Sequence, residues 1–215
     1  MNDAISVLIV DDHQMFRQGI WSRLEDEPDI KVVGETGTAE EAVALVDKTS
    51  PMIVLLDIRL PSMSGIEAAR MLRKRYPEVR ILILTGYDFD QYIRAAARAG
   101  IQGYLLKDAP QQALVDAIRE IAAGGTVLSP NVASKVIQNL AVSTGTSRRQ
   151  TWELTVREIE ILEMLYQGLR NADIAGRLAI SPRTVEAHVG SIIAKLGAQS
   201  RTEAVRIGVE KKIIR

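Results

Sequence analysis

Short apolar runs rich in β-branched residues alternate with longer amphipathic stretches through the first half of the sequence. The runs are Val7–Val10, Lys31–Val33, Ile53–Leu56, Ile81–Leu84 and Tyr104–Leu106. Each is followed by a segment whose apolar residues have helical spacing, as in Phe16, Ile20 and Leu24. Because parallel strands require crossover connections, this alternation predicts a doubly wound α/β domain with a five-stranded parallel sheet covered on both faces.

The alternation fades after Gly124. Residues 125–150 contain one possible short helix, Val132–Leu140, followed by the segment AVSTGTSRRQ, which is rich in Ser, Thr and Gly and has no apolar period. Such a composition is typical of a linker. We therefore expect a first domain over residues 1–124, a linker over 125–150 and a second domain over 151–215.

The C-terminal segment carries helix signals and no strand signals. Four residues suited to N-capping divide it into four short helices: Thr155, Asn171, Ser181 and Ser200. The first and last of these precede a Glu by three residues, which is the capping-box pattern. The second and third predicted helices, Asn171–Ala179 and Pro182–Leu196, are separated by a tight turn. This is the layout of a helix-turn-helix in a small all-α domain.

The third of these helices has two different faces. At about 100° per residue one face is apolar and must be buried, and it carries Val185, Val189, Ile192 and Leu196. The opposite face is polar or small, with Arg183, Ala187, Gly190, Ser191 and Ala194. A helix with such a face can lie in the major groove of DNA. The pattern alone fits a piece of a generic four-helix bundle equally well.

Composition excludes several classes of protein. The chain has no Cys and two His, so disulfides, thiolate metal sites and a His-rich metal cage are ruled out. The N-terminus MNDAISVLIVDD lacks the features of a signal peptide, and no apolar run approaches the roughly 20 residues that span a bilayer. We expect a cytoplasmic protein without membrane contact. Residues 151–215 carry 10 basic and 8 acidic residues, a small excess that fits nucleic acid weakly.

Residues able to support phosphoryl chemistry fall at the ends of the predicted strands. Asp11 and Asp12 end the first strand, Asp57 the third and Thr85 the fourth, and Lys107 follows the fifth. In a doubly wound sheet these ends meet at one edge. Three carboxylates at close quarters need a cation, and the hard ion Mg²⁺ suits them. An Asp carboxylate can attack phosphorus, while Lys and Thr stabilise the transferred oxygens.

Taken together, these residues resemble the receiver domains of two-component response regulators, over roughly residues 5–123. The matching motifs are Val10-Asp11-Asp12-His13, Leu56-Asp57-Ile58-Arg59-Leu60-Pro61, Leu84-Thr85 and Tyr104-Leu105-Leu106-Lys107-Asp108-Ala109. The resemblance implies a flavodoxin-like fold in which Asp57 accepts a phosphoryl group from a phosphohistidine of a sensor histidine kinase. It also implies Mg²⁺ bound by Asp11, Asp12, Asp57 and the backbone carbonyl of Arg59, and an aromatic switch at Tyr104. Many receivers have Pro directly after the strand-five Lys, whereas Asp108 stands here, which leaves the conformation of the Lys107–Asp108 peptide open.

The C-terminal segment resembles the LuxR-type domain of the NarL/FixJ family of response regulators, over about residues 152–207. The matching motifs include Leu154-Thr155-Val156-Arg157-Glu158, Gly168-Leu169-Arg170-Asn171, Leu178-Ala179-Ile180-Ser181, Thr184-Val185 and Lys195-Leu196-Gly197. The family implies dimeric binding to paired DNA half-sites, with Val205 and Val209 of the fourth helix as candidates for the dimer contact. We expect DNA contacts from Arg183, Thr184, Glu186, Ala187, His188, Gly190, Ser191 and Lys195. Glu186 departs from the family, which commonly has Lys there.

We therefore expect a two-component transcription regulator whose DNA binding is controlled by phosphorylation, and we do not expect an enzyme. A haloacid-dehalogenase-type phosphatase would need a second Asp two residues after the nucleophile, where Arg59 stands. A flavodoxin-like cofactor binder would need a Gly/Ser/Thr cradle in the first loop, which reads Asp12-His13-Gln14-Met15. A third alternative, a receiver that works without phosphate, is left open by the sequence.

Overall fold

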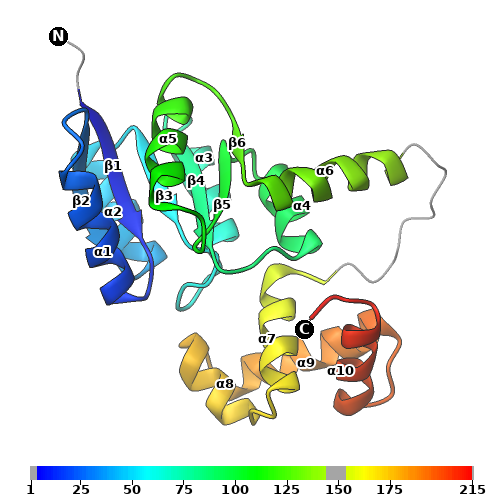
Figure 1. Cartoon of the computed structure of the whole chain (residues 1–215). Helices are drawn as coiled ribbons and strands as arrows, with labels where there is room; N and C mark the ends of the chain where they lie inside the picture. Colours follow the sequence, from blue (N-terminus) through cyan, green and yellow to red (C-terminus); the bar gives the residue numbers. More distant parts are fainter. Residues whose placement is uncertain (1–3, 144–153, 215) are drawn as a thin grey trace. The chain divides into compact units, whose positions relative to one another are not determined.

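The computed structural model describes residues 4–143 and 154–214. The described chain divides into two compact units, the first built around a sheet and the second from the C-terminal helices (Figure 1). Each unit has its own buried apolar core. The residues 144–153, which include most of the predicted linker segment AVSTGTSRRQ, lie outside the described chain.

A six-stranded parallel sheet forms the centre of the first unit, in the order β2-β1-β3-β4-β5-β6. Its strands are Ile5–Val10, Ile30–Thr36, Ile53–Leu56, Arg80–Thr85, Gly103–Leu106 and Val127–Leu128. The predicted doubly wound parallel sheet is thus confirmed, and the strand count is corrected from five to six. The sixth strand was missed because two residues are too few to show a period in the sequence.

Helices cover both faces of this sheet (Figure 1). They are α1 Gln14–Glu25, α2 Ala39–Thr49, α3 Gly65–Arg75 and α5 Gln111–Ala122, while α4 Asp90–Arg98 follows β4 and α6 Pro130–Ser143 follows β6. Helices α1 and α5 share one core cluster, in which Leu24 and Ile118 pack against alternate residues of the strands such as Val7 and Leu82. Because successive side chains of a strand point to opposite faces, the strands read as nearly continuous apolar runs when both faces are covered.

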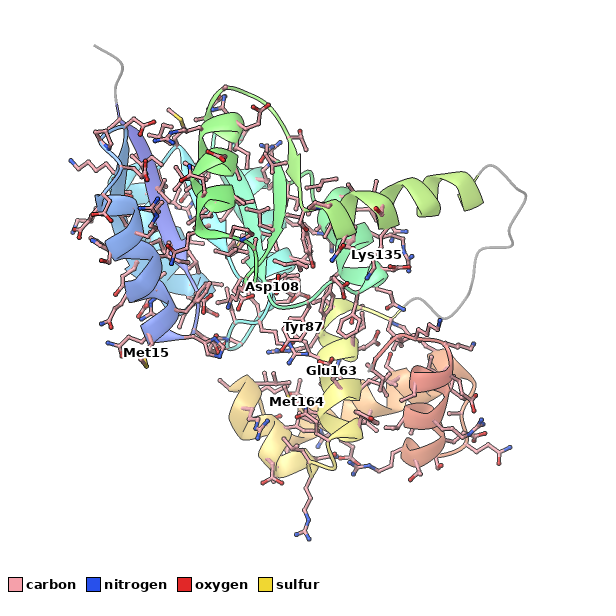
Figure 2. The ribbon with its side chains drawn as sticks, in the orientation of Figure 1. Met15, Tyr87, Asp108, Lys135, Glu163 and Met164 are labelled. Carbon is pink, nitrogen blue, oxygen red and sulfur yellow. The ribbon has the colours of Figure 1, made fainter. Side chains whose placement is uncertain are left out.

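The segment predicted as a linker begins with ordered structure. β6 pairs with β5, so the sheet extends past residue 124. The short helix predicted at Val132–Leu140 is part of α6, which is longer at both ends. Lys135 of α6, labelled in Figure 2, lies with its ammonium nitrogen 2.8 Å from a carboxylate oxygen of Asp88 in the loop after β4. This ion pair attaches α6 to the carboxyl edge of the sheet.

Residues 89–94 and 136–143 belong to the second unit, whose remainder consists of the four predicted helices. They are α7 Val156–Tyr166, α8 Asn171–Leu178, α9 Pro182–Leu196 and α10 Arg201–Glu210. Thr155, Ser181 and Ser200 cap their helices as predicted, each accepting a hydrogen bond from a backbone N–H three residues on. Asn171 does not cap α8, because it is the first helical residue; the Asp173 carboxylate instead accepts from the backbone N–H of Arg170.

Two glycines of the first unit should respond oppositely to alanine. A β-carbon at Gly103 of β5 would lie 2.6 Å from Leu82 Cδ1, so Gly103→Ala should destabilise the unit by about 1–3 kcal/mol through overpacking. Gly19, inside α1, has open space, so Gly19→Ala should stabilise it by about 0.5–1 kcal/mol. Urea unfolding monitored by Trp21 fluorescence, with Trp152 replaced by Phe in every protein, measures both. Equal midpoints for the two variants would contradict the packing described around β5.

Candidate functional site

Backbone hydrogen bonds between neighbouring strands position the acidic edge of the first unit. The N–H of Asp11 donates to the Thr36 carbonyl at 3.0 Å and that of Asp57 to the Val10 carbonyl at 2.9 Å. The N–H of Lys107 donates to the Thr85 carbonyl at 2.8 Å. Asp11, Asp57 and Lys107 are therefore each the first residue past their strand, still held by backbone hydrogen bonds to the neighbouring strand, and Thr85 is the last residue of β4. This brings Asp11, Asp57, Thr85 and Lys107 to one edge, as the sequence predicted.

The Lys107 ammonium joins the two buried carboxylates. Its nitrogen lies 2.6 Å from an oxygen of Asp11 and 2.7 Å from an oxygen of Asp57, and both Asp residues are 3% exposed. Burial raises the pKa of Asp57 above its ordinary value; Lys107 opposes the rise and Asp11 adds to it. Burial alone would lower the pKa of Lys107, but Asp57 and Asp11 outweigh it and raise that pKa. Lys107 thus stays charged beside a carboxylate of raised basicity.

Thr85 contributes a buried hydroxyl beside Asp57, close enough to oppose the rise in the pKa of that carboxyl. The residue is fully buried at the end of β4, and its Oγ1 has no hydrogen-bond partner within the described residues. The Asp57 carboxylate accepts one bond from the Ile58 N–H at 2.7 Å and one from Lys107. A buried polar atom without a partner is costly, so a site of this kind is suited to a ligand with acceptor oxygens.

A cation fits beside these residues. One ligand atom from each of Asp11, Asp12, His13 and Asp57 lies within 4.8 Å of the others. The carboxylate oxygens of this group are the ligands that Mg²⁺ prefers. The His13 ring adds a nitrogen ligand, since its Nδ1 lies 2.7 Å from an Asp12 oxygen. The predicted fourth ligand, the backbone carbonyl of Arg59, stays a prediction. The acidic set has the chemistry expected for a hard divalent cation, because its ligands are mainly carboxylates.

The loops around the site are held by aromatic contacts that the sequence did not reveal. Tyr104 is 1% exposed and its hydroxyl donates to the Tyr87 carbonyl at 2.6 Å. The Arg59 guanidinium carbon lies 3.8 Å from the centre of the Tyr87 ring, a cation–π contact. Tyr87, labelled in Figure 2, lies in the loop after β4. It therefore connects the loop after Asp57 with β5, and its role could not be found from a motif.

Gly65 is required by the backbone that leaves Asp57. Its N–H donates to the Ile58 carbonyl at 2.7 Å, and a β-carbon there would lie 1.8 Å from the Asp57 carbonyl oxygen. Only glycine permits this approach, which explains why a glycine stands eight residues after Asp57. The peptide between Lys107 and Asp108, which the sequence left open, is trans. Asp108, labelled in Figure 2, is exposed beside the site.

The helix α9 presents most of the predicted DNA-contacting residues to solvent. Those exposed are Arg183, Thr184, Glu186, Ala187 and Gly190. His188, Ser191 and Lys195 are half-buried. On the other side of the helix Val185, Ile192 and Leu196 are buried as predicted. The helix is thus amphipathic in the sense required for a groove-binding element.

Two of these residues are bound within the protein. Glu158 of α7, 3% exposed, accepts a hydrogen bond from the Ser191 hydroxyl at 2.6 Å, and its two oxygens lie 2.8 and 2.6 Å from the Lys195 nitrogen. Burial alone would raise the pKa of Glu158, but these bonds and that of the Thr155 N–H hold it below its ordinary value. The sequence identified Glu158 only as part of a capping box. Its link to α9 spans more than 30 residues and has no local signal.

The architecture and sites define a DNA-binding response regulator. Residues 7–119 match the family model described as response regulator receiver domain, and residues 153–207 match the one described as bacterial regulatory proteins, luxR family. The chain belongs to the NarL/FixJ family of two-component response regulators. The predicted family, fold class and general function are thereby confirmed. No helix in the described parts of the chain has the length and apolar character to cross a membrane.

Full-length relatives support this assignment. The chain is 37% identical over 214 residues to the uncharacterised transcriptional regulatory protein YxjL of Bacillus subtilis, covering 99% of this chain and 98% of the relative. It is 36% identical over 212 residues to the response regulator VraR of Staphylococcus aureus, covering 98% and 99% of the two chains.

Solved structures of response regulators are similar to this chain over nearly its whole length. The response regulator ChrA of a heme-sensing two-component system is 37% identical, with a TM-score of 0.54 and coverage of 98% of this chain and 99% of that one. RcsB of Salmonella typhimurium is 21% identical, with a TM-score of 0.71 and coverage of 99% and 100%. At that identity RcsB supports the fold alone.

The lowered pKa of Glu158 predicts how acid affects the second unit. A folded pKa below the ordinary value of 4.5 stabilises the folded state above that pH, and the stabilisation is lost as pH falls through the folded pKa. The difference in Tm between wild type and Glu158→Gln should therefore be largest near neutral pH and shrink below about pH 4.5. Calorimetry across this range measures it. A difference that persists unchanged in acid would contradict the ionised role of Glu158.

Proposed function

We propose that Asp57 accepts a phosphoryl group from a phosphohistidine of a sensor histidine kinase, and that this modification controls DNA binding. The observation that carries the proposal is the buried Asp57 carboxylate 2.7 Å from the Lys107 ammonium, beside a Thr85 hydroxyl that lacks a partner within the described chain. An attacking carboxylate, a fixed cation and a free donor are what phosphoryl transfer to Asp requires.

In the proposed step an Asp57 oxygen forms a bond to phosphorus while the bond from phosphorus to the donor imidazole nitrogen breaks. Lys107 and Thr85 donate to the peripheral oxygens of the transferred group. A Mg²⁺ ion, held by Asp11, Asp12, Asp57 and the backbone carbonyl of Arg59, would supply the remaining positive charge. Tyr104 is the proposed switch residue, because its hydroxyl bond to the Tyr87 carbonyl fixes the loop that follows Thr85.

We class the protein as a regulator and not as an enzyme, with function in the cytoplasm. Arg59 stands where a haloacid-dehalogenase-type phosphatase needs its second Asp, and its side chain stacks on Tyr87. We also propose a receiver domain over residues 1–124 and a LuxR-type domain over 151–215, with a connection over 125–150 that starts with β6 and α6.

The helix α9 is the proposed recognition element for double-stranded DNA. The proposed contacts are Arg183, Thr184, Glu186, Ala187, His188, Gly190, Ser191 and Lys195. A solved structure of RcsB contains two dimers bound to two parallel DNAs, and by analogy with it we propose that this chain binds DNA as a homodimer. Val205 and Val209 of α10 are the proposed dimer contact, and Val209 is 41% exposed. An exposed apolar residue on a helix that packs against α7 and α9 suits a symmetric interface.

Incubation with a small-molecule phosphoryl donor and Mg²⁺ should add one phosphate to the wild-type protein and none to Asp57→Asn. The reason is that, among the residues the structure describes, only Asp57 combines burial, the Lys107 ion pair and the neighbouring Thr85 hydroxyl. Intact-mass spectrometry measures the gain, and Asp108→Asn, which removes an exposed carboxylate beside Lys107, is the matched control that should still be labelled. Labelling of Asp57→Asn would refute the assignment.

The same preparations test the switch. Phosphorylated wild type should bind its selected DNA site more tightly than the unmodified protein, because a new dianion held by Lys107 and Thr85 biases the surrounding loops. In Lys107→Ala the gain should be lost even in molecules that carry phosphate. Equal DNA affinity for both states of the wild type would support the alternative of a receiver that works without phosphate.

Glu186→Lys should strengthen binding to every DNA duplex and relax sequence preference at one base pair. Glu186 is exposed on α9, where a carboxylate repels phosphates and can accept a bond from cytosine. The substitution should steepen the salt dependence by roughly one phosphate contact and cost on the order of 1–3 kcal/mol of discrimination. Competition titrations at two salt concentrations measure both, with Glu40→Lys on α2 as the charge-matched control. Unchanged values would place Glu186 away from the duplex.

A further inference from the structure

The Glu158 carboxylate is completely used by four contacts inside the second unit. One oxygen accepts from the Ser191 hydroxyl at 2.6 Å and lies 2.8 Å from the Lys195 nitrogen. The other lies 2.6 Å from that nitrogen and accepts from the Thr155 backbone N–H at 2.6 Å. Glu158 is 3% exposed, so these bonds replace water and have no competitor from solvent.

These contacts hold one side of the recognition helix α9 against α7. Ser191 and Lys195 are four residues apart, which places them one turn apart on the same side of a helix. The helices α7 and α9 pack against each other, and each carries buried apolar residues such as Ile159 and Val185. Apolar packing is non-directional and by itself would tolerate rotation of α9. A buried carboxylate with fixed donors specifies one rotation, because any other leaves it without partners.

We propose that Glu158 is the positioning residue of the recognition helix: it binds Ser191 and Lys195 within the protein and leaves reading of the duplex to Arg183, Glu186 and Ala187. The proposal rests on the DNA-binding function of α9 given under Proposed function and removes Ser191 and Lys195 from the contacts given there, because both are bound to Glu158. At about 100° per residue Arg183 and Ala187 lie opposite the buried Val185, whereas Ser191 and Lys195 lie at the flank nearer the core.

The arrangement can be tested through the charge of Lys195, because a free ammonium on α9 would change how DNA binding depends on salt. In the wild type its ammonium is bound by a buried carboxylate, so the pair is electrically neutral toward DNA although the Lys195 side chain is 32% exposed. Replacing Glu158 by Gln removes that counter-charge and releases an ammonium on the DNA-binding helix. A released ammonium near a duplex becomes a phosphate contact, and each such contact adds roughly 0.9 to the slope of log K against log salt.

The experiment uses four full-length proteins: wild type, Glu158→Gln, Lys195→Met and the double variant. Binding to a random-sequence duplex is titrated at several salt concentrations, and Tm is measured without DNA. We expect a slope steeper by roughly 0.9 per bound subunit in Glu158→Gln, and a wild-type slope in the double variant. Lys195→Met should lose on the order of 10 °C in Tm, because it strands a buried carboxylate, and the double variant should recover most of the loss.

Glu210→Gln is the matched control, since it releases Arg206 from an exposed ion pair on α10 and should not steepen the slope as Glu158→Gln does. A double variant whose slope is shallower than wild type by one contact would overturn the proposal, because Lys195 would then already bind phosphate. Additive Tm losses in the two single variants would also overturn it, by showing that the pair is not coupled. Failure of the wild type to bind any duplex would refute the DNA-binding function itself, which distinguishes the two failures.

Discussion

The Lys107 ammonium lies between two carboxylates that are almost completely buried, and the organisation of the first unit depends on this interaction. Two ionised Asp side chains at such an edge would repel each other without a cation, and burial increases that cost. The parallel sheet meets this condition through its geometry, because the carboxyl ends of β1, β3 and β5 converge and each site residue is the first one past its strand. Gly65 then allows the chain to turn back directly over Asp57.

The second unit uses the same kind of buried ion pair for another purpose. Glu158 is as buried as Asp57, and Lys195 is paired with it as Lys107 is paired with Asp57. The difference lies in what remains unsatisfied. Around Glu158 every acceptor position has a donor, and the donors come from one helix, α9, and from the N-cap of α7. A buried polar network that is complete fixes a single arrangement of the elements that contribute to it.

The sequence predicted the elements whose signals are local and repeated. Strand runs, helix periodicity and the caps at Thr155, Ser181 and Ser200 were all recovered, as were the residues at the acidic edge, since strand ends in a doubly wound sheet must meet. What failed has equally physical reasons. The strand β6 has only two residues, which is too few to show a period in the sequence. At the start of α8 the capping hydrogen bond is made by the Asp173 carboxylate and not by the Asn171 side chain. The contacts of Tyr87 and Glu158 join residues far apart in the chain, so no local sequence motif could predict them.

The contrast between the two sites follows from what each must do. A site that responds to a ligand has to contain a hydrogen-bonding group that the unmodified protein does not satisfy. The buried Thr85 hydroxyl, for which no partner is found in the described structure, is such a group. A site that holds a geometry must contain none, because a spare donor or acceptor would allow a second arrangement of similar energy. Asp57 and Glu158 are therefore both buried carboxylates paired with lysine; in the functions proposed above, the first accepts a phosphoryl group and the second holds one orientation of α9.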